Sequence, residues 1–100
     1  MIVTVFRSRL NPEVQEEYQQ WAARMSELAR TIPGYVSHKG FVAQDGERVT
    51  IVEFESEEGM RAWARHPEHV EAKQKGRNSF FSEYRVQICR VDSDRGFPRA

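Results

Sequence analysis

Hydrophobic residues along this chain recur with two periods, one of two residues and one of three to four. Four stretches rich in β-branched and aromatic residues predict strands, at residues 2–9, 35–42, 49–54 and 82–91. From Pro12 to Ile32, apolar residues return every third or fourth position, which predicts an amphipathic helix of about five turns. We expect Asn11 to cap this helix and Pro33-Gly34 to end it.

A second helical segment follows the third strand. Ser56 can cap it through its hydroxyl group. Pro67 disfavours helical geometry at the preceding residue but suits the first turn of a new helix. We therefore expect a helix in two pieces with His66 at the joint, and we expect Gly76 and Asn78 to end the second piece.

The predicted order is strand, helix, strand, strand, helix, strand, with a hairpin turn at Asp45-Gly46. This order predicts an α+β, ferredoxin-like βαββαβ fold, in which two helices cover one face of a four-stranded antiparallel sheet. Both faces of the first strand are largely apolar, so the second face also needs a cover. We expect a homodimer that packs sheet against sheet.

Size and composition narrow the class of protein. We expect one domain over residues 1–91, followed by a polar tail or partner-embracing arm over residues 92–100. Fifteen basic and fifteen acidic side chains cancel, which argues against nucleic acid or an anionic membrane as a partner. No apolar run is long enough to span a membrane. The single Cys89 cannot form an internal disulfide and fits a reducing compartment, so we expect a cytoplasmic protein.

Polar candidates for chemistry are few. His66 and His69 have a spacing that suits a metal on a regular helix, but Pro67 disturbs that helix and a third ligand would have to come from elsewhere. We therefore expect no metal, and either a structural role or a hydrogen bond from one histidine to a substrate oxygen. Cys89 with a histidine would make a nucleophile and base, but a lone strand cysteine is usually a small buried hydrophobe.

Aromatic residues suggest a pocket between the helices and the sheet. Trp63 near the helix joint either packs in the core or forms a wall of this pocket. The residues expected to line it with Trp63 are Tyr35, Phe54, Phe80 and Phe81. Arg85 lies in a strand that is otherwise apolar in pattern. An ion pair with Glu53 on a neighbouring strand is one interpretation, and a polar group in the pocket is the other.

Several short motifs together resemble the antibiotic biosynthesis monooxygenase (ABM) family, over residues 2–91. The motifs are Ile32-Pro33-Gly34-Tyr35, Gly46-Glu47-Arg48-Val49, Phe54-Glu55-Ser56, Ala62-Trp63, His66-Pro67-Glu68-His69 and Gly76-Arg77. The resemblance implies a ferredoxin-like dimer whose two sheets form an α/β barrel. It also implies oxidation of a small aromatic or quinol-type compound without metal, flavin or another cofactor.

In such oxygenases the substrate anion reacts with oxygen, while the protein supplies a dry apolar pocket and hydrogen-bond donors. By analogy Trp63 would be a pocket wall, and His66, His69 and Arg85 the candidate catalytic residues. The haem-degrading branch of the family fits less well, because its haem-ligating histidine falls where this chain has Lys73. The alternative from another class is a non-catalytic dimeric module that binds a small molecule or has a stress-related role.

Overall fold

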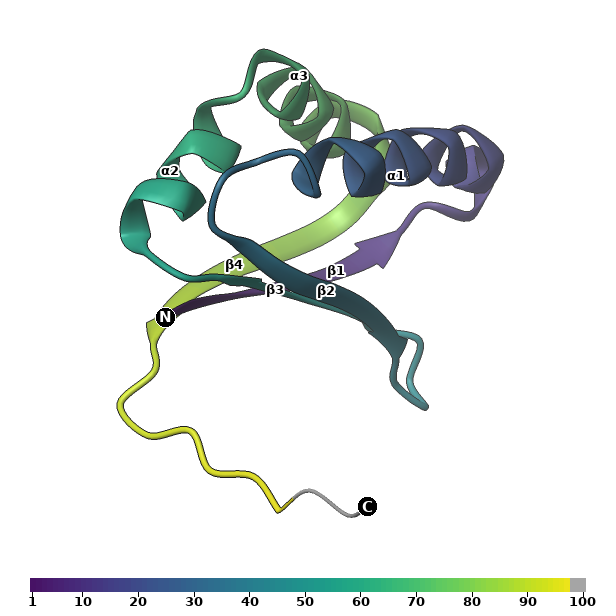
Figure 1. Ribbon diagram of the computed structural model, residues 1–100. Coiled ribbons are helices and arrows are strands. Elements are labelled where there is room, and N and C mark those ends of the chain that lie inside the picture. Colours follow the sequence, from purple (N-terminus) through teal and green to yellow (C-terminus); the bar gives the residue numbers. More distant parts are fainter. Residues whose placement is uncertain (98–100) are drawn as a thin grey trace.

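Four antiparallel strands form one sheet in the order β2-β3-β1-β4, and the helices lie together on one of its faces (Figure 1). The computed structural model describes residues 1–97. The elements in chain order are β1 (Ile2–Leu10), η1 (Pro12–Val14), α1 (Gln15–Ala29), β2 (Tyr35–Val42), β3 (Arg48–Phe54), α2 (Glu57–Arg65), α3 (Pro67–Lys75), η2 (Gly76–Phe80) and β4 (Phe81–Arg90). The predicted α+β, ferredoxin-like order is confirmed.

The core lies between the sheet and α2. Ile2 of β1 pairs with Phe54 of β3, so both side chains point to the same face, and Met60 of α2 packs against them. Phe54 is 0% exposed, and burying such a side chain contributes about 2 to 3 kcal/mol. Ile32 at the end of the first helical segment packs against this cluster and ties α1 to it.

The second helical segment is divided as the sequence predicts. Ser56 adopts an extended backbone, and its Oγ accepts a hydrogen bond from the Gly59 amide at 3.3 Å. α2 ends at Arg65, and α3 starts at Pro67. Between them the backbone of His66 is extended, with ψ 131°. This joint turns the chain and sets α3 beside α1 (Figure 1).

Gly59 lets α2 approach the loop before β2 closely. A Cβ at this position would lie 2.8 Å from the carbonyl oxygen of Pro33. In the same loop Gly34 has φ 89°, a left-handed conformation that only glycine adopts readily. The Pro33-Gly34 pair therefore ends the first helical segment and also forms the surface on which α2 sits.

Of two predicted end signals, Asn11 and Gly76, the first acts differently from the prediction. The side chain of Asn11 makes no hydrogen bond to the helix that follows it. Instead, its Nδ2 donates to the carbonyl oxygen of Ser79 at 2.7 Å, and its backbone N–H donates to the carbonyl oxygen of Phe80. α3 ends at Lys75 with Gly76 as its C-cap, as the sequence predicts, and the chain continues through a single π-helical turn from Gly76 to Phe80. Asn11 therefore fastens this turn to the end of β1, and the turn leads directly into β4.

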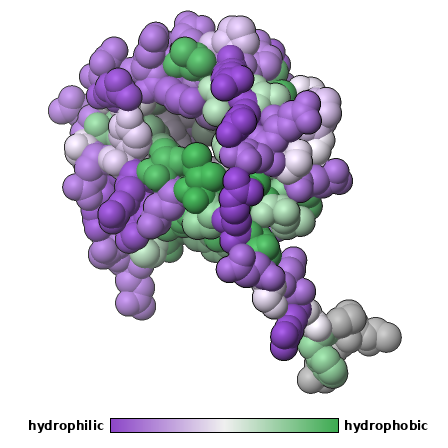
Figure 2. Space-filling view, turned by 90° about the vertical axis from the view of Figure 1, so that its left-hand side faces the viewer, coloured by the Kyte–Doolittle hydropathy of each residue, from purple (hydrophilic) through white to green (hydrophobic). Residues whose placement is uncertain are grey.

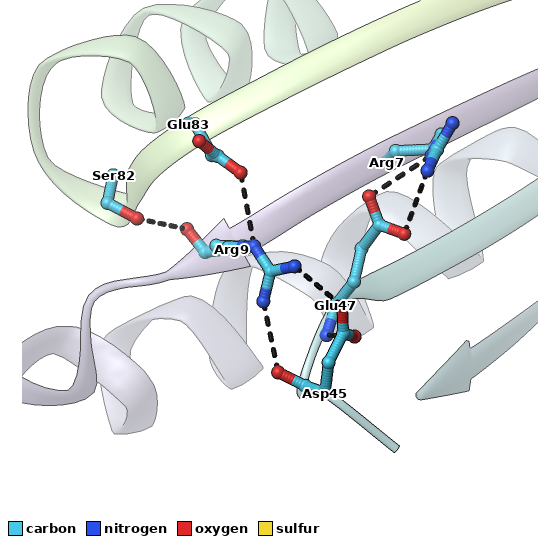
Figure 3. A network of polar contacts seen from close by, with 6 residues as sticks. All are labelled: Arg7, Arg9, Asp45, Glu47, Ser82 and Glu83. Carbon is cyan, nitrogen blue, oxygen red and sulfur yellow. Dashed lines mark hydrogen bonds and ion pairs between the residues drawn. The ribbon is translucent and has the colours of Figure 1, made fainter. Parts of the chain in front are cut away.

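Ion pairs hold the β2–β3 hairpin against the sheet (Figure 3). Arg7 of β1 donates two hydrogen bonds to the carboxylate of Glu47, at 3.1 and 3.0 Å. Arg9 donates to Asp45 at 2.9 Å and to Glu83 of β4 at 3.1 Å. These pairs connect the hairpin, β1 and β4, and they position the Arg7 end of the sheet.

The helix-free face of the sheet carries an apolar centre. Cross-strand pairs place Val3, Val5 and Ile51 on it, all half-buried, and Phe41 of β2 is 48% exposed there. Beyond β4, residues 91–97 form no helix or strand and run away from the body on the helix-free side (Figure 1). The last three residues of the predicted tail, 98–100, lie outside the described residues. Within residues 1–97 no helix has the length and apolar character needed to cross a membrane.

Candidate functional site

The helices leave β4 uncovered. Val86 and Ile88 pair with Phe6 and Thr4 of β1, which places them on the helix-facing side of the sheet. Even so, Val86 is 49% exposed and Ile88 58% exposed. The space beside α2 and α3 is therefore open above an apolar strand, and Figure 2 shows a hollow at this end of the molecule with hydrophobic side chains beneath it. We name this surface the β4 groove and assign to it the apolar β4 residues and the neighbouring side chains described below, Trp63, His69, Lys73, Tyr84, Val86 and Ile88.

Trp63 and His69 form the wall of the β4 groove on the helix side. Their rings are stacked, with centroids 3.9 Å apart and planes inclined by 15°. Trp63 also packs against the core cluster around Phe54, which fixes the indole from below. Pro67 makes this contact possible, because the bend before it brings the first turn of α3 back over the last turn of α2.

His69 is held as a neutral imidazole. Its Nδ1 lies 2.9 Å from the Trp63 carbonyl oxygen, which can only accept, so Nδ1 carries the proton. Burial lowers the pKa of His69 to about 4, and the charges of Lys73 and His66 act in the same direction. Nε2 is then an unprotonated acceptor. No group among residues 1–97 bonds it, and every fully buried side-chain nitrogen or oxygen there has a partner, so Nε2 is accessible.

Two cations continue the wall along the same helix. Lys73 donates from Nζ to the Ala64 carbonyl oxygen at 2.7 Å. Burial lowers the pKa of Lys73, while Tyr84 of β4 raises it. Arg77 approaches the Tyr84 hydroxyl with Nε at 3.4 Å and Nη2 at 3.3 Å. The polar end of the β4 groove therefore consists of Lys73, Arg77 and the Tyr84 hydroxyl.

Aromatic rings close this end of the groove. Phe81 and Tyr84 of β4 both contact Phe6, with centroids 5.4 and 5.9 Å away. Gly76 permits the approach, since a Cβ there would lie 2.8 Å from the Phe81 ring. Of the aromatic residues expected in the pocket, Phe81 lies beside the groove. Phe80 is buried beneath it against Tyr18 of α1.

The other predicted residues lie away from the groove. His66 caps α3, with Nδ1 accepting from the Glu68 amide at 3.2 Å. Tyr35 contacts Phe54 in the core, and its hydroxyl bonds His38 Nδ1 at 2.6 Å. Arg85 pairs with Arg7 across the strands, which places it on the helix-free face. The structure thus brings Trp63 and His69 together, while Phe81 packs beside Tyr84.

Arg85 lines a different, polar hollow of about 270 Å³ at the Arg7 end of the sheet. Glu53, the suggested partner of Arg85, accepts a hydrogen bond from Ser37 instead and pairs with Val3 in the register. Within residues 1–97, no three histidine, cysteine, aspartate or glutamate side chains are grouped so that they could hold a metal ion.

Sequence reasoning missed Lys73, Arg77 and Tyr84 as members of the site. The signal was present, because His69, Lys73 and Arg77 are spaced by four residues and so share one face of a helix. Tyr84 also leads the alternation that places Val86 and Ile88 on the same face of β4. The other residues of this helix are mostly polar, which hides the pattern in the sequence.

A ferredoxin-like α+β domain with a groove between its second helical segment and its last strand defines the class of protein. Comparison with known proteins identifies the family within this class. Residues 1–75 match the profile described as antibiotic biosynthesis monooxygenase, and the chain belongs to this family. The uncharacterized protein YqjZ of Bacillus subtilis is 32% identical over 93 residues, which are 93% of this chain and 82% of YqjZ.

Solved structures agree with this fold. Rv0793 from Mycobacterium tuberculosis superimposes with a TM-score of 0.83 at 14% identity, covering 95% of this chain and 98% of that one. SnoaB, a cofactor-independent oxygenase from Streptomyces nogalater, superimposes with a TM-score of 0.76 at 17% identity, covering 93% and 94%. At such identities the likeness establishes the shared fold.

Proposed function

We propose that this protein binds a small aromatic or quinol-type compound in the β4 groove and oxidises it with molecular oxygen, without a cofactor. The observation that carries the proposal is the stacked pair of Trp63 and His69, with a neutral imidazole whose Nε2 is accessible and bonds no group of residues 1–97. Membership of the ABM family and the fold shared with SnoaB, described as a cofactor-independent oxygenase, support the reaction class.

In the proposed reaction His69 Nε2 accepts a proton from the substrate, which becomes an enolate or phenolate. This anion transfers an electron to oxygen, and the two radicals combine to form a carbon–oxygen bond. Loss of water from the hydroperoxide converts a CH₂ group into a carbonyl: R₂CH₂ + O₂ gives R₂C=O + H₂O. All four electrons come from the substrate, so no separate reductant is needed. The expected role of His69 thus changes from hydrogen-bond donor to proton acceptor.

The alternative is a module that binds such a compound without chemistry. The openness of the groove favours it, because Val86 and Ile88 are half-exposed and a dry site stabilises a reacting anion better than a wet one. In both cases the ligand lies against Trp63, so binding alone does not separate them. Oxygen consumption does.

We also propose that two copies pack their helix-free faces together, as a dimeric α/β barrel. Val5 and Ile51 form the apolar centre of that face, and a twofold arrangement would cover it with an identical surface. We place the dimer in the cytoplasm, because Cys89 is an exposed free thiol of a kind that reducing compartments maintain.

Oxygen uptake with a panel of anthrone- and quinol-type compounds tests the catalytic proposal. We expect the wild type to accelerate uptake for at least one compound and His69→Phe to lose about 10²-fold or more of the rate, the usual range for a general base. Glu71→Gln, a change at an exposed position of the same helix, is the control. Equal rates for all three proteins would leave only the binding module.

A further inference from the structure

His69, Lys73 and Arg77 lie on one face of α3 and its continuation, at intervals of four residues. Each is linked to the groove by a contact of its own. The His69 ring lies on Trp63, Lys73 bonds the carbonyl oxygen of Ala64, the residue after that tryptophan, and Arg77 bonds the hydroxyl of Tyr84. One acceptor nitrogen and two cations therefore follow one another along this face, and Arg77 reaches β4 through the Tyr84 hydroxyl.

Neither cation has an acidic partner. Lys73 bonds a backbone carbonyl oxygen and Arg77 a tyrosine hydroxyl, and within residues 1–97 no carboxylate pairs with either. Lys75 on the same helix differs, because its Nζ pairs with Glu17 at 3.1 Å. Two positive charges without a counter-ion, of which Lys73 is partly desolvated, favour binding of an anion.

Tyr84 completes the arrangement. Its hydroxyl accepts from Arg77, which leaves the phenolic proton free to be donated to a ligand oxygen. The Phe6 and Phe81 rings pack on the Tyr84 ring and hold it in place. An oxygen anion beside this hydroxyl would receive hydrogen bonds from up to three groups.

We propose that Lys73, Arg77 and Tyr84 form an anion-binding end of the β4 groove, which selects aromatic ligands that carry an ionised oxygen, a carboxylate or an acidic hydroxyl. This inference rests on ligand binding in the groove and does not require catalysis. Arg77 lies eight positions after His69, which is a rise of about 12 Å along a helix. A ligand of two or three fused rings has the length to contact Trp63 at one end and the cations at the other.

Calorimetric titration with matched probes tests the proposal. One pair is 2-naphthoate and 2-naphthamide, and the other is 4-nitro-1-naphthol, ionised at pH 8, and its methyl ether. We expect the wild type to bind the anion of at least one pair about tenfold more tightly than its neutral match. Lys73→Met, which keeps the aliphatic stem, should remove that preference by lowering the affinity for the anion. Lys73→Arg should restore it.

Lys75→Met is the control on the same helix, and we expect it to keep the preference. Arg77→Gln gives a second test if Lys73→Met unfolds, which circular dichroism would show. Equal affinity of the wild type for both members of both pairs overturns the proposal, as does a preference that survives both Lys73→Met and Arg77→Gln. Anion selectivity without oxygen uptake would refute the proposed oxygenase activity and support the anion-binding site. Oxygen uptake without anion selectivity would support the oxygenase activity and refute the anion-binding site.

Discussion

The imidazole of His69 stacks on the indole of Trp63 and bonds the carbonyl oxygen of the same residue, six positions earlier in the chain. One contact fixes the plane of the ring and the other fixes its tautomer. The ring is therefore oriented before any ligand arrives, with Nε2 as a proton acceptor at neutral pH. This preorganisation is what an acid–base role in the groove needs.

Acid should destabilise the protein through His69. The pKa of His69 is about 4 in the folded chain and about 6.5 in an unfolded one. The unfolded state therefore binds more protons as pH falls, and stability is lost between pH 6.5 and 4. The difference corresponds to at most about 3 kcal/mol. Urea unfolding at pH 7 and pH 4 should show a smaller loss for His69→Phe than for the wild type, and equal losses would contradict the assigned burial.

Gly59→Ala should destabilise the fold although alanine is the better helix former. The propensity gain is about 1 kcal/mol, but the new Cβ would lie 2.8 Å from the Pro33 carbonyl oxygen, a backbone atom that cannot rotate away. Shifting α2 off this loop disturbs the core around Phe54, so we expect a net loss of about 1 to 3 kcal/mol in chemical denaturation. Gly96→Ala, where nothing lies within 4 Å, is the control. A stabilised Gly59→Ala protein would refute the close contact.

His66→Ala should weaken α3 by removing its cap. The Glu68 amide would lose its side-chain acceptor, a change that costs about 1 kcal/mol at typical N-caps. His66→Asn should recover most of that stability, because asparagine caps well. Thermal unfolding of the three proteins measures this. If His66→Asn is as unstable as His66→Ala, the cap is not the reason for a histidine at the joint.

Ile51→Asp should yield a monomer. Ile51 lies opposite Val5 at the centre of the helix-free face, where a charge would be buried between two sheets. Val42→Asp, a 65% exposed position near the hairpin, should leave the assembly unchanged. Sedimentation equilibrium at micromolar concentration measures the mass. A monomeric wild type would contradict the proposed dimer.

The elements of this fold are predictable because each has a local cause. Pro67 divides the second helical segment, Ser56 caps its first piece, and Gly46 takes the positive φ of the hairpin turn. A prediction was wrong where a side chain found a hydrogen-bond partner far away in the sequence. Asn11 has good capping chemistry, yet it bonds Ser79, which is 68 residues later in the sequence.

The site was predictable only in part. The helix joint at His66 indicates that Trp63 and His69 lie close together. The face that Arg85 occupies depends on the strand register, which the local sequence does not reveal. The sequence of a helix also does not indicate which strand of the sheet the helix leaves uncovered. Tyr84 became relevant only once η2 directed Arg77 towards its hydroxyl. Long-range placement of this kind depends on tertiary packing rather than on local pattern.

Chemical-shift mapping by two-dimensional NMR with an aromatic probe tests the central claim most directly. We predict that 2-naphthoate shifts the indole NH of Trp63, the imidazole of His69 and the methyl groups of Val86 and Ile88, while Phe41 on the helix-free face is unaffected. Shifts confined to the helix-free face, or none at millimolar probe, would contradict a ligand site in the β4 groove.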